Sequence, residues 1–146
     1  MAQTPEEWEN MAVVRRFFEA GPSSGDLPAA DALLAPGFTL HVPLPAPGPG
    51  IPAMNNIITS CRAAFHGLHV TIEDLMADGD RVTCRFTARG VHDGEFMGVP
   101  PTGKQIVMTG IEIFRLRDGK IEELWGEANL MGLMQQLDLL PGNPQG

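Results

Sequence analysis

The sequence predicts an α+β fold in which one curved antiparallel sheet wraps around N-terminal helices. Apolar residues recur at helical spacing in the segments before residue 65. From Leu68 onward they alternate with a period of two, which is typical of strands. Asp118-Gly119 lies between two apolar runs and is the strongest hairpin signal in the chain. Helices followed by a meander must bury their apolar faces together, and we expect a cavity between the sheet and the helices.

The first half of the chain is expected to hold three helices and one short strand. Thr4-Pro5-Glu6-Glu7 has the chemistry of a helix start, with a capping box and a proline at the first helical position, and Gly21-Pro22 ends that helix. A short helix is predicted from about 26 to 35, stopped by Pro36-Gly37, and a strand from 38 to 42. The proline-rich run 43–52 is predicted to be a stiff loop, because proline excludes a helix interior and a central strand. A third helix is predicted over 53–65.

The second half is expected to be a four-stranded meander. Strands are predicted over 68–77, 81–92, 105–116 and 120–128, with glycine, aspartate and proline in the connecting turns. A last helix is predicted over 130–140, before Pro141-Gly142.

Size and charge restrict the function. The 146 residues fit one domain, 1–146, and the fractions of 43% hydrophobic and 19% charged residues are those of a globular protein. A net charge of −8 argues against nucleic acid and against an anionic membrane surface as partners. The N-terminal residues lack the basic and apolar regions of a signal peptide, and no run approaches the roughly 20 apolar residues of a membrane span. We therefore expect a cytoplasmic protein with reduced cysteines.

Strand parity predicts which side chains face the cavity. On the strand 105–116, one face carries apolar residues and a single carboxylate, Glu112. A carboxylate in an apolar row is costly unless it is paired, protonated or lining a cavity. Two interpretations stay open for Glu112, a functional acid or base and a carboxylate that pairs with an arginine or is turned outward by a bulge.

The other candidate site residues are two histidines, a tryptophan and a set of apolar residues. His92 lies at a strand end beside a glycine-rich turn, and His41 has the parity opposite to Phe38 and Leu40, so each histidine is either a pocket residue or partly exposed. The four histidines are scattered, so no metal site is expected. Trp125 is either a core or subunit-interface residue or a stacking platform for a ligand. The predicted substrate-binding residues are Leu40, Met54, Ile58, Phe65, Phe86, Met108, Phe114 and Trp125.

Two runs, 90–103 and 110–126, resemble the SnoaL-like polyketide cyclase family. The similarity extends to Glu9–Phe18 and Leu33–Phe38, followed by His41, and covers most of the chain. The resemblance implies the α+β cone of the nuclear-transport-factor-2-like (cystatin-like) superfamily. It also implies a homo-oligomer, most simply a dimer, that packs through the outer face of the sheet.

The resemblance also implies an activity. SnoaL-like cyclases close a ring by intramolecular aldol condensation without a metal or other cofactor, using an acid/base aspartate on the last strand and a histidine on the preceding one. Here the aspartate position falls on Gly126 and the histidine position on Glu112, and a polar position near the first strand falls on Leu40. The sequence therefore departs from the family pattern at each of these positions.

Several functions remain open from the sequence. The first is a cofactor-independent cyclase or isomerase for a hydrophobic polyketide-like intermediate, with Glu112 as general base and His92, His41 or Asn129 donating a hydrogen bond to the developing oxyanion. The second is a cyclase that orients a flexible chain for a pericyclic ring closure with little acid/base chemistry. Hydroxylation or epoxide opening in the same fold, and non-catalytic binding of a small ligand, are the further alternatives.

Overall fold

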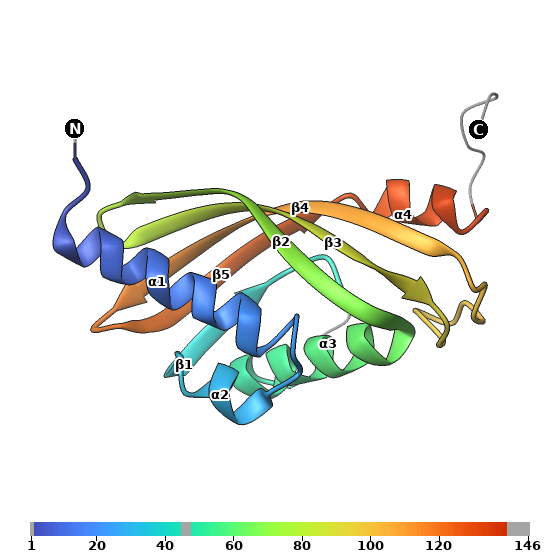
Figure 1. The fold of residues 1–146 in the computed structure, drawn as a ribbon. Helices are drawn as coiled ribbons and strands as arrows, with labels where there is room; N and C mark the ends of the chain where they lie inside the picture. The colour runs from blue at the N-terminus through green and yellow to red at the C-terminus, as the bar shows by residue number, and fades with distance from the viewer. Residues whose placement is uncertain (1, 45–47, 140–146) are drawn as a thin grey trace.

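The computed structural model describes residues 2–44 and 48–139 of the chain. Within them the chain forms four helices and five strands (Figure 1). In order, these are α1 (Pro5–Ala20), α2 (Leu27–Asp31), β1 (Leu34–His41), α3 (Gly50–Ala64), β2 (Phe65–Asp78), β3 (Arg81–His92), β4 (Gln105–Arg117), β5 (Lys120–Ala128) and α4 (Leu130–Gln136). The predicted α+β fold with its curved sheet is confirmed.

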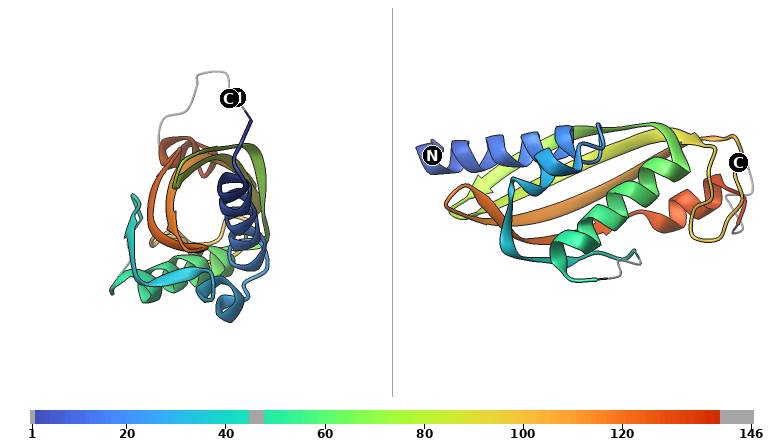
Figure 2. Two further views of the ribbon diagram at one scale, coloured as in Figure 1. Left: turned by 90° about the vertical axis from the view of Figure 1, so that its left-hand side faces the viewer. Right: turned by 90° about the horizontal axis from the view of Figure 1, so that it is seen from below.

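All five strands form a single sheet with the order β1-β5-β4-β3-β2. Strands β2 to β5 make the predicted antiparallel meander, and β4 and β5 join through the Asp118-Gly119 turn. Strand β1 pairs with β5 in parallel, a pairing that the sequence pattern did not predict. Helix α3 carries the chain from β1 at one edge of the sheet to β2 at the other edge. The helices α1, α2 and α3 lie on the concave side of the sheet, which curls around α1 (Figures 1 and 2).

The start of α1 has the predicted capping box. The backbone N–H of Glu7 donates to Thr4 Oγ1 over 3.1 Å, and the backbone N–H of Thr4 donates to Glu7 Oε1 over 2.8 Å. The second oxygen of Glu7 accepts a hydrogen bond of 2.8 Å from the backbone N–H of Gly79, in the β2–β3 turn. Glu7 therefore caps α1 and also ties that helix to one end of the sheet.

Some predicted boundaries were wrong around prolines. Helix α2 is shorter than predicted, and β1 begins at Leu34 and runs through Pro36-Gly37. Because β1 is an edge strand, a proline there breaks no ladder between two neighbours. Helix α3 begins at Gly50 because Pro52 lies in its first turn, where a backbone N–H has no helical partner. Part of the proline-rich loop, residues 45–47, lies outside the described residues.

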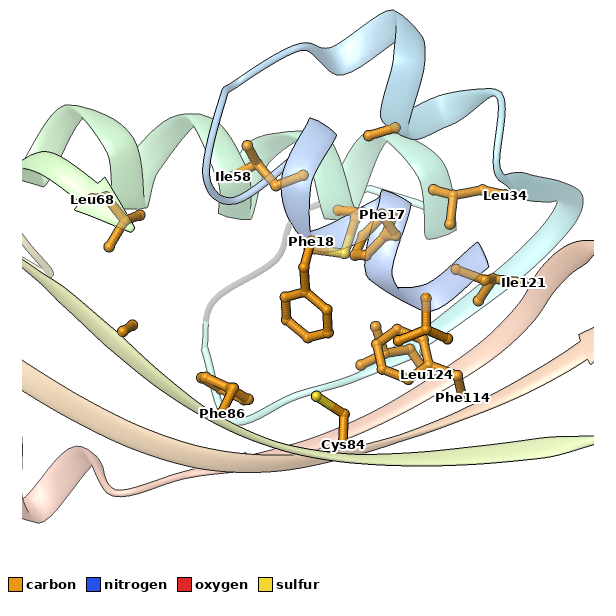
Figure 3. Packing of buried hydrophobic residues seen from close by; sticks show 14 of the residues in the cluster. Phe17, Phe18, Leu34, Ile58, Leu68, Cys84, Phe86, Phe114, Ile121 and Leu124 are labelled. Carbon is orange, nitrogen blue, oxygen red and sulfur yellow. The ribbon is translucent and has the colours of Figure 1, made fainter. Parts of the chain in front are cut away.

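The two faces of the sheet differ in the burial of their side chains, as the strand parity predicted. Val82, Cys84, Phe86 and Ala88 of β3 are buried against the helices. Phe114 of β4 packs edge-on against Phe17 and Phe18 of α1, with ring centroids 6.1 and 5.8 Å apart. Figure 3 shows Phe18 pointing from α1 toward the sheet, above Phe86 and Cys84. No helix in the described residues is long and apolar enough to cross a membrane.

Candidate functional site

A cavity of about 120 Å³ lies between the inner face of the sheet and the helices α1 and α3. About 10–15 Å³ of such a cavity is enough to hold one water molecule. The lining is almost wholly apolar. It consists of Phe17, Phe18, Pro22, Val42, Pro43, Leu44, Met54, Ile57, Ile58, Cys61, Phe65, Leu68, Val70, Phe86, Ala88, Phe96, Ile106, Met108, Glu112, Gly126, Glu127, Ala128 and Leu133.

Glu112 lies on the inner face of β4 and reaches into this cavity. Its register neighbours are Cys84 on β3 and Gly126 on β5, so it is in the middle of the sheet. Within the described residues, no hydrogen bond or ion pair joins its carboxyl group to another side chain. Burial in the apolar lining raises the pKa of Glu112 to about 8, because the charged form is poorly solvated there. Both the arginine pairing and the outward turn that remained open for Glu112 are excluded.

The neighbouring glycine makes room for this carboxyl group. A Cβ atom at Gly126 would lie 2.8 Å from Glu112 Oε2 and 3.0 Å from Val42 Cγ1, closer than ordinary van der Waals contact. The resemblance placed an aspartate at position 126 and a histidine at position 112. In this chain the carboxyl group comes from β4 instead and lies over the glycine of β5.

His92 is buried, but it is not among the residues that line the cavity. Its Nδ1 lies 3.0 Å from Thr102 Oγ1, its Nε2 is buried without a hydrogen-bond partner, and its ring packs on Phe65 at 5.6 Å. Phe65 does line the cavity, so His92 lies behind the lining. The expected hydrogen bond from His92 to a reacting group is not supported by this position.

His41 and Trp125 lie on the outer face of the sheet. Their rings stack with centroids 5.6 Å apart, and His41 Nε2 lies 2.7 Å from Glu123 Oε2. The guanidinium of Arg81 lies over the Trp125 ring, 5.3 Å from its centroid. Neither residue lines the cavity, so the structure contradicts their placement in the pocket. The reason is parity, because both side chains alternate with inward residues, Leu40 and Leu124.

Asn129 has a structural role at the start of α4. Its Oδ1 accepts a hydrogen bond of 2.9 Å from the backbone N–H of Gly132, and it thereby caps α4. Leu40 packs against the core, and Phe114 is buried in the aromatic cluster with Phe17 and Phe18. None of these three predicted residues is part of the cavity lining.

The remaining predicted substrate-binding residues do line the cavity, namely Met54, Ile58, Phe65, Phe86 and Met108. Their contact with a substrate stays a prediction. Other lining residues were not predicted. Val42 shares the parity of Phe38 and Leu40, and Ile57 and Cys61 share the apolar face of α3, so both patterns could have identified them. Phe96 lies in the irregular β3–β4 segment, where no periodicity shows which side chain points inward.

Few ionisable side chains line the cavity. Glu112 and Glu127 are the two carboxylate residues among the described residues of the lining, and no lysine, arginine or histidine of the described chain lines it. The thiol of Cys61 is also part of the lining, and burial raises its pKa to about 11. No group of three or more metal-ligating side chains occurs in the part of the chain that the structure describes. Chemically, this cavity can hold an apolar molecule and exchange a proton with it through Glu112.

Comparisons with known proteins place this chain in a family. The sequence pattern of the SnoaL-like polyketide cyclases matches residues 12–137. A search of curated proteins gave no match. IdmH from Streptomyces antibioticus, proposed to be a polyketide cyclase, is 33% identical over 88% of this chain and 98% of its own, with a TM-score of 0.78.

Two further solved structures are similar over most of the chain. AclR from Streptomyces galilaeus, proposed to be a hydroxylase, is 28% identical, with 95% of this chain and 87% of its own covered and a TM-score of 0.84. A protein from Jannaschia sp. CCS1, proposed to be a SnoaL-like polyketide cyclase, is 25% identical, with 97% and 99% covered and a TM-score of 0.84. The chain therefore belongs to the SnoaL-like polyketide cyclase family.

Proposed function

We propose that the protein is a cofactor-independent cyclase or isomerase that acts on a hydrophobic, polyketide-like intermediate enclosed in the cavity. The observation that carries the proposal is the unpaired carboxyl group of Glu112 in an apolar lining, with a pKa of about 8. Catalytic carboxyl groups work best when their pKa is close to the working pH, because the group can then both remove and return a proton. Membership of a family of cyclases supports the same reaction class.

A single carboxyl group is sufficient for an aldol ring closure. In its ionised form, which at pH 7 is about one molecule in ten for a pKa of 8, Glu112 removes a proton from the carbon next to a substrate carbonyl. The resulting enolate carbon attacks a second carbonyl of the same molecule, and a C–C bond forms. The new alkoxide then takes the proton back from Glu112, so the enzyme returns to its starting state. No histidine is needed as a separate acid in this sequence of steps.

The test uses a substrate that needs only a base. Opening of 5-nitrobenzisoxazole requires the removal of one carbon-bound proton, after which the N–O bond breaks and a nitrophenolate forms. We expect the protein to accelerate this reaction, with a rate that rises as the pH increases through about 8, since the ionised form of Glu112 is the base. Glu112→Gln should lower the rate by about 10²-fold or more.

Glu127→Gln is the matched control, because Glu127 also borders the cavity but is exposed. The control variant should retain the activity of the wild type. An equal loss in both variants, or no loss in Glu112→Gln, would contradict the role of Glu112.

A second candidate is a cyclase that acts by shape, with a pericyclic ring closure. The specific observation in its favour is that His92, His41 and Asn129 do not reach the cavity, so the described lining offers few polar groups besides Glu112. Such an enzyme would orient its substrate by packing alone. Its turnover of the physiological substrate would survive Glu112→Gln and would be lost when a larger side chain at Ala88 fills the cavity.

A further inference from the structure

The carboxyl group of Glu112 has no positively charged partner in the described chain. Charges inside proteins are normally paired, because an isolated carboxylate in apolar surroundings is poorly solvated. No lysine, arginine or histidine of the described residues lines the cavity, and no ion pair among them includes this carboxyl group. A positively charged partner for the ionised form would therefore have to come from a bound molecule.

Aromatic rings lie near this carboxyl group. Phe86 follows Cys84 on the inner row of β3, and Cys84 is the register neighbour of Glu112. A Cβ atom added at Gly110, the next inner residue of β4, would lie 2.4 Å from Phe86 Cζ. Phe18 packs against Phe86 with ring centroids 5.8 Å apart, and Figure 3 shows it above Phe86 and Cys84. The two rings therefore lie close to the inner face of β4 beside Glu112.

The rest of the lining also suits a positive charge. Phe17, Phe65 and Phe96 add three further rings, and those of Phe65 and Phe96 are 5.0 Å apart. The faces of aromatic rings carry partial negative charge and attract organic cations. Glu127, which borders the cavity, adds a second carboxylate. The cavity is thus an aromatic space in which every formal charge of the described lining is negative.

We propose that the cavity binds an apolar molecule with one positively charged nitrogen, which pairs with the carboxylate of Glu112 and lies against the ring of Phe86. This inference deepens the proposed function and rests on it, because it takes the cavity as the substrate site. Glu112 is ionised while such a molecule is bound, and this is the form that removes a proton in the proposed reaction. A neutral molecule of the same shape leaves the carboxylate without a partner.

Binding of a cation is coupled to the loss of a proton from Glu112. For a pKa of about 8, about one molecule in ten is ionised at pH 7 and about nine in ten at pH 9. The affinity for a cation that does not itself titrate should therefore rise about tenfold between these pH values.

Other charged or ionisable groups lie on the elements around Glu112. They are Cys84 on β3, Cys61 on α3 and Glu127 on β5, and Arg15 of α1 acts on the Cys84 thiol. Burial raises the pKa of Cys84 to about 12 and that of Cys61 to about 11, so both thiols stay neutral up to pH 9. Glu127 needs a control variant, because it borders the same cavity.

The experiment compares two probes of one shape and different charge, phenyltrimethylammonium and tert-butylbenzene. Calorimetric titration at pH 7 and pH 9 should show that the wild type binds the cation about tenfold more tightly at pH 9, with no such rise for tert-butylbenzene. Glu112→Gln should abolish the rise, and the matched control Glu127→Gln should keep it. Phe86→Leu should weaken binding of the cation several-fold more than binding of tert-butylbenzene, because the ring that faces the charge is lost.

The outcomes separate this proposal from the proposed function. If the wild type binds tert-butylbenzene but not the cation, or if its affinity for the cation does not rise with pH, the cation proposal is wrong and the proposed function remains. The cation proposal is also wrong if the rise persists in Glu112→Gln or is lost in Glu127→Gln as well. If neither probe binds, the cavity is not a site for apolar ligands, and both proposals fail together.

Discussion

A glutamate on the inner face of the sheet and one on the outer face have opposite shifts in pKa. On the outer face, Glu123 accepts one hydrogen bond from Arg115 and is hydrogen-bonded to His41, and these partners lower its pKa. On the inner face, Glu112 has no such partner, and burial raises its pKa to about 8. The two residues lie on adjacent strands. The difference shows that the surroundings of a glutamate in this sheet decide whether it is a paired surface charge or an unpaired group in an apolar cavity.

Replacing an aromatic residue by alanine should show the largest difference in stability between the inner and outer faces. Phe114→Ala removes a fully buried ring that packs against Phe17 and Phe18, so we expect a loss of about 3–5 kcal/mol in the free energy of unfolding. Trp125→Ala on the outer face should cost clearly less, because the indole is only half-buried and its partners His41 and Arg81 remain solvated. Urea denaturation measures both values. Equal losses would contradict the assignment of the core to the inner face.

Replacing the buried carboxylate should stabilise the protein at alkaline pH. The folded pKa of Glu112 lies above its unfolded value of 4.5, so the contribution of this group to stability is fully present below pH 4.5 and is lost as the pH rises through 8. Glu112→Gln avoids this loss. At pH 9 the variant should be more stable than the wild type by roughly 2–5 kcal/mol, and the difference should vanish as the pH falls below the unfolded value of 4.5.

Thermal and urea unfolding at several pH values measure this difference, and Glu123→Gln on the outer face is the control. The lowered pKa of Glu123 has the opposite sign, so its contribution is present above its unfolded pKa and is lost in acid. A variant Glu112→Gln that is less stable than the wild type at pH 9 would show that the carboxylate has a structural partner.

A small change at Gly126 should disturb Glu112 more than it disturbs the fold. The added Cβ of Gly126→Ala would meet the end of a flexible side chain, Glu112 Oε2, and one methyl group of Val42. We expect a loss of about 1 kcal/mol in stability and a lower rate of 5-nitrobenzisoxazole opening, since the carboxyl group must move. Combining Gly126→Ala with Glu112→Ala, which removes the contacting carboxyl group, tests the contact directly. Strictly additive stability effects of the two substitutions would contradict it.

The fold and its inner face could be predicted because they depend on local patterns. Strand parity predicted the inward row of β3, and the limits of β3 and β5 agree with the prediction. The same parity identified Glu112 as the carboxylate of an apolar row. The expected homo-oligomer and cytoplasmic location stay predictions. Val107 and Ile111 are exposed apolar residues on the outer face of β4.

The partners of Glu112 could not be predicted, because they depend on contacts between distant segments. His92 was expected near the reacting group, but its ring lies behind Phe65, which belongs to the neighbouring strand β2. Phe96 contributes to the lining through a segment in which Met97 and Gly98 have positive φ angles of 50° and 82°. No periodic pattern in the sequence indicates such a backbone conformation. The buried carboxyl group of Glu112, with no histidine beside it in the described part of the lining, is therefore a finding of the three-dimensional structure.

The most direct test of the role of Glu112 is the titration of its own carboxyl group. Carbon-13 NMR of protein labelled at the glutamate carboxyl carbons, with Glu112→Gln to assign the resonance, gives the pKa of that one group. An inflection near pH 8 is the result that burial in the apolar cavity predicts. An inflection near 4.5 would mean that the carboxyl group is well solvated or paired in solution, and it would contradict the central role given to Glu112.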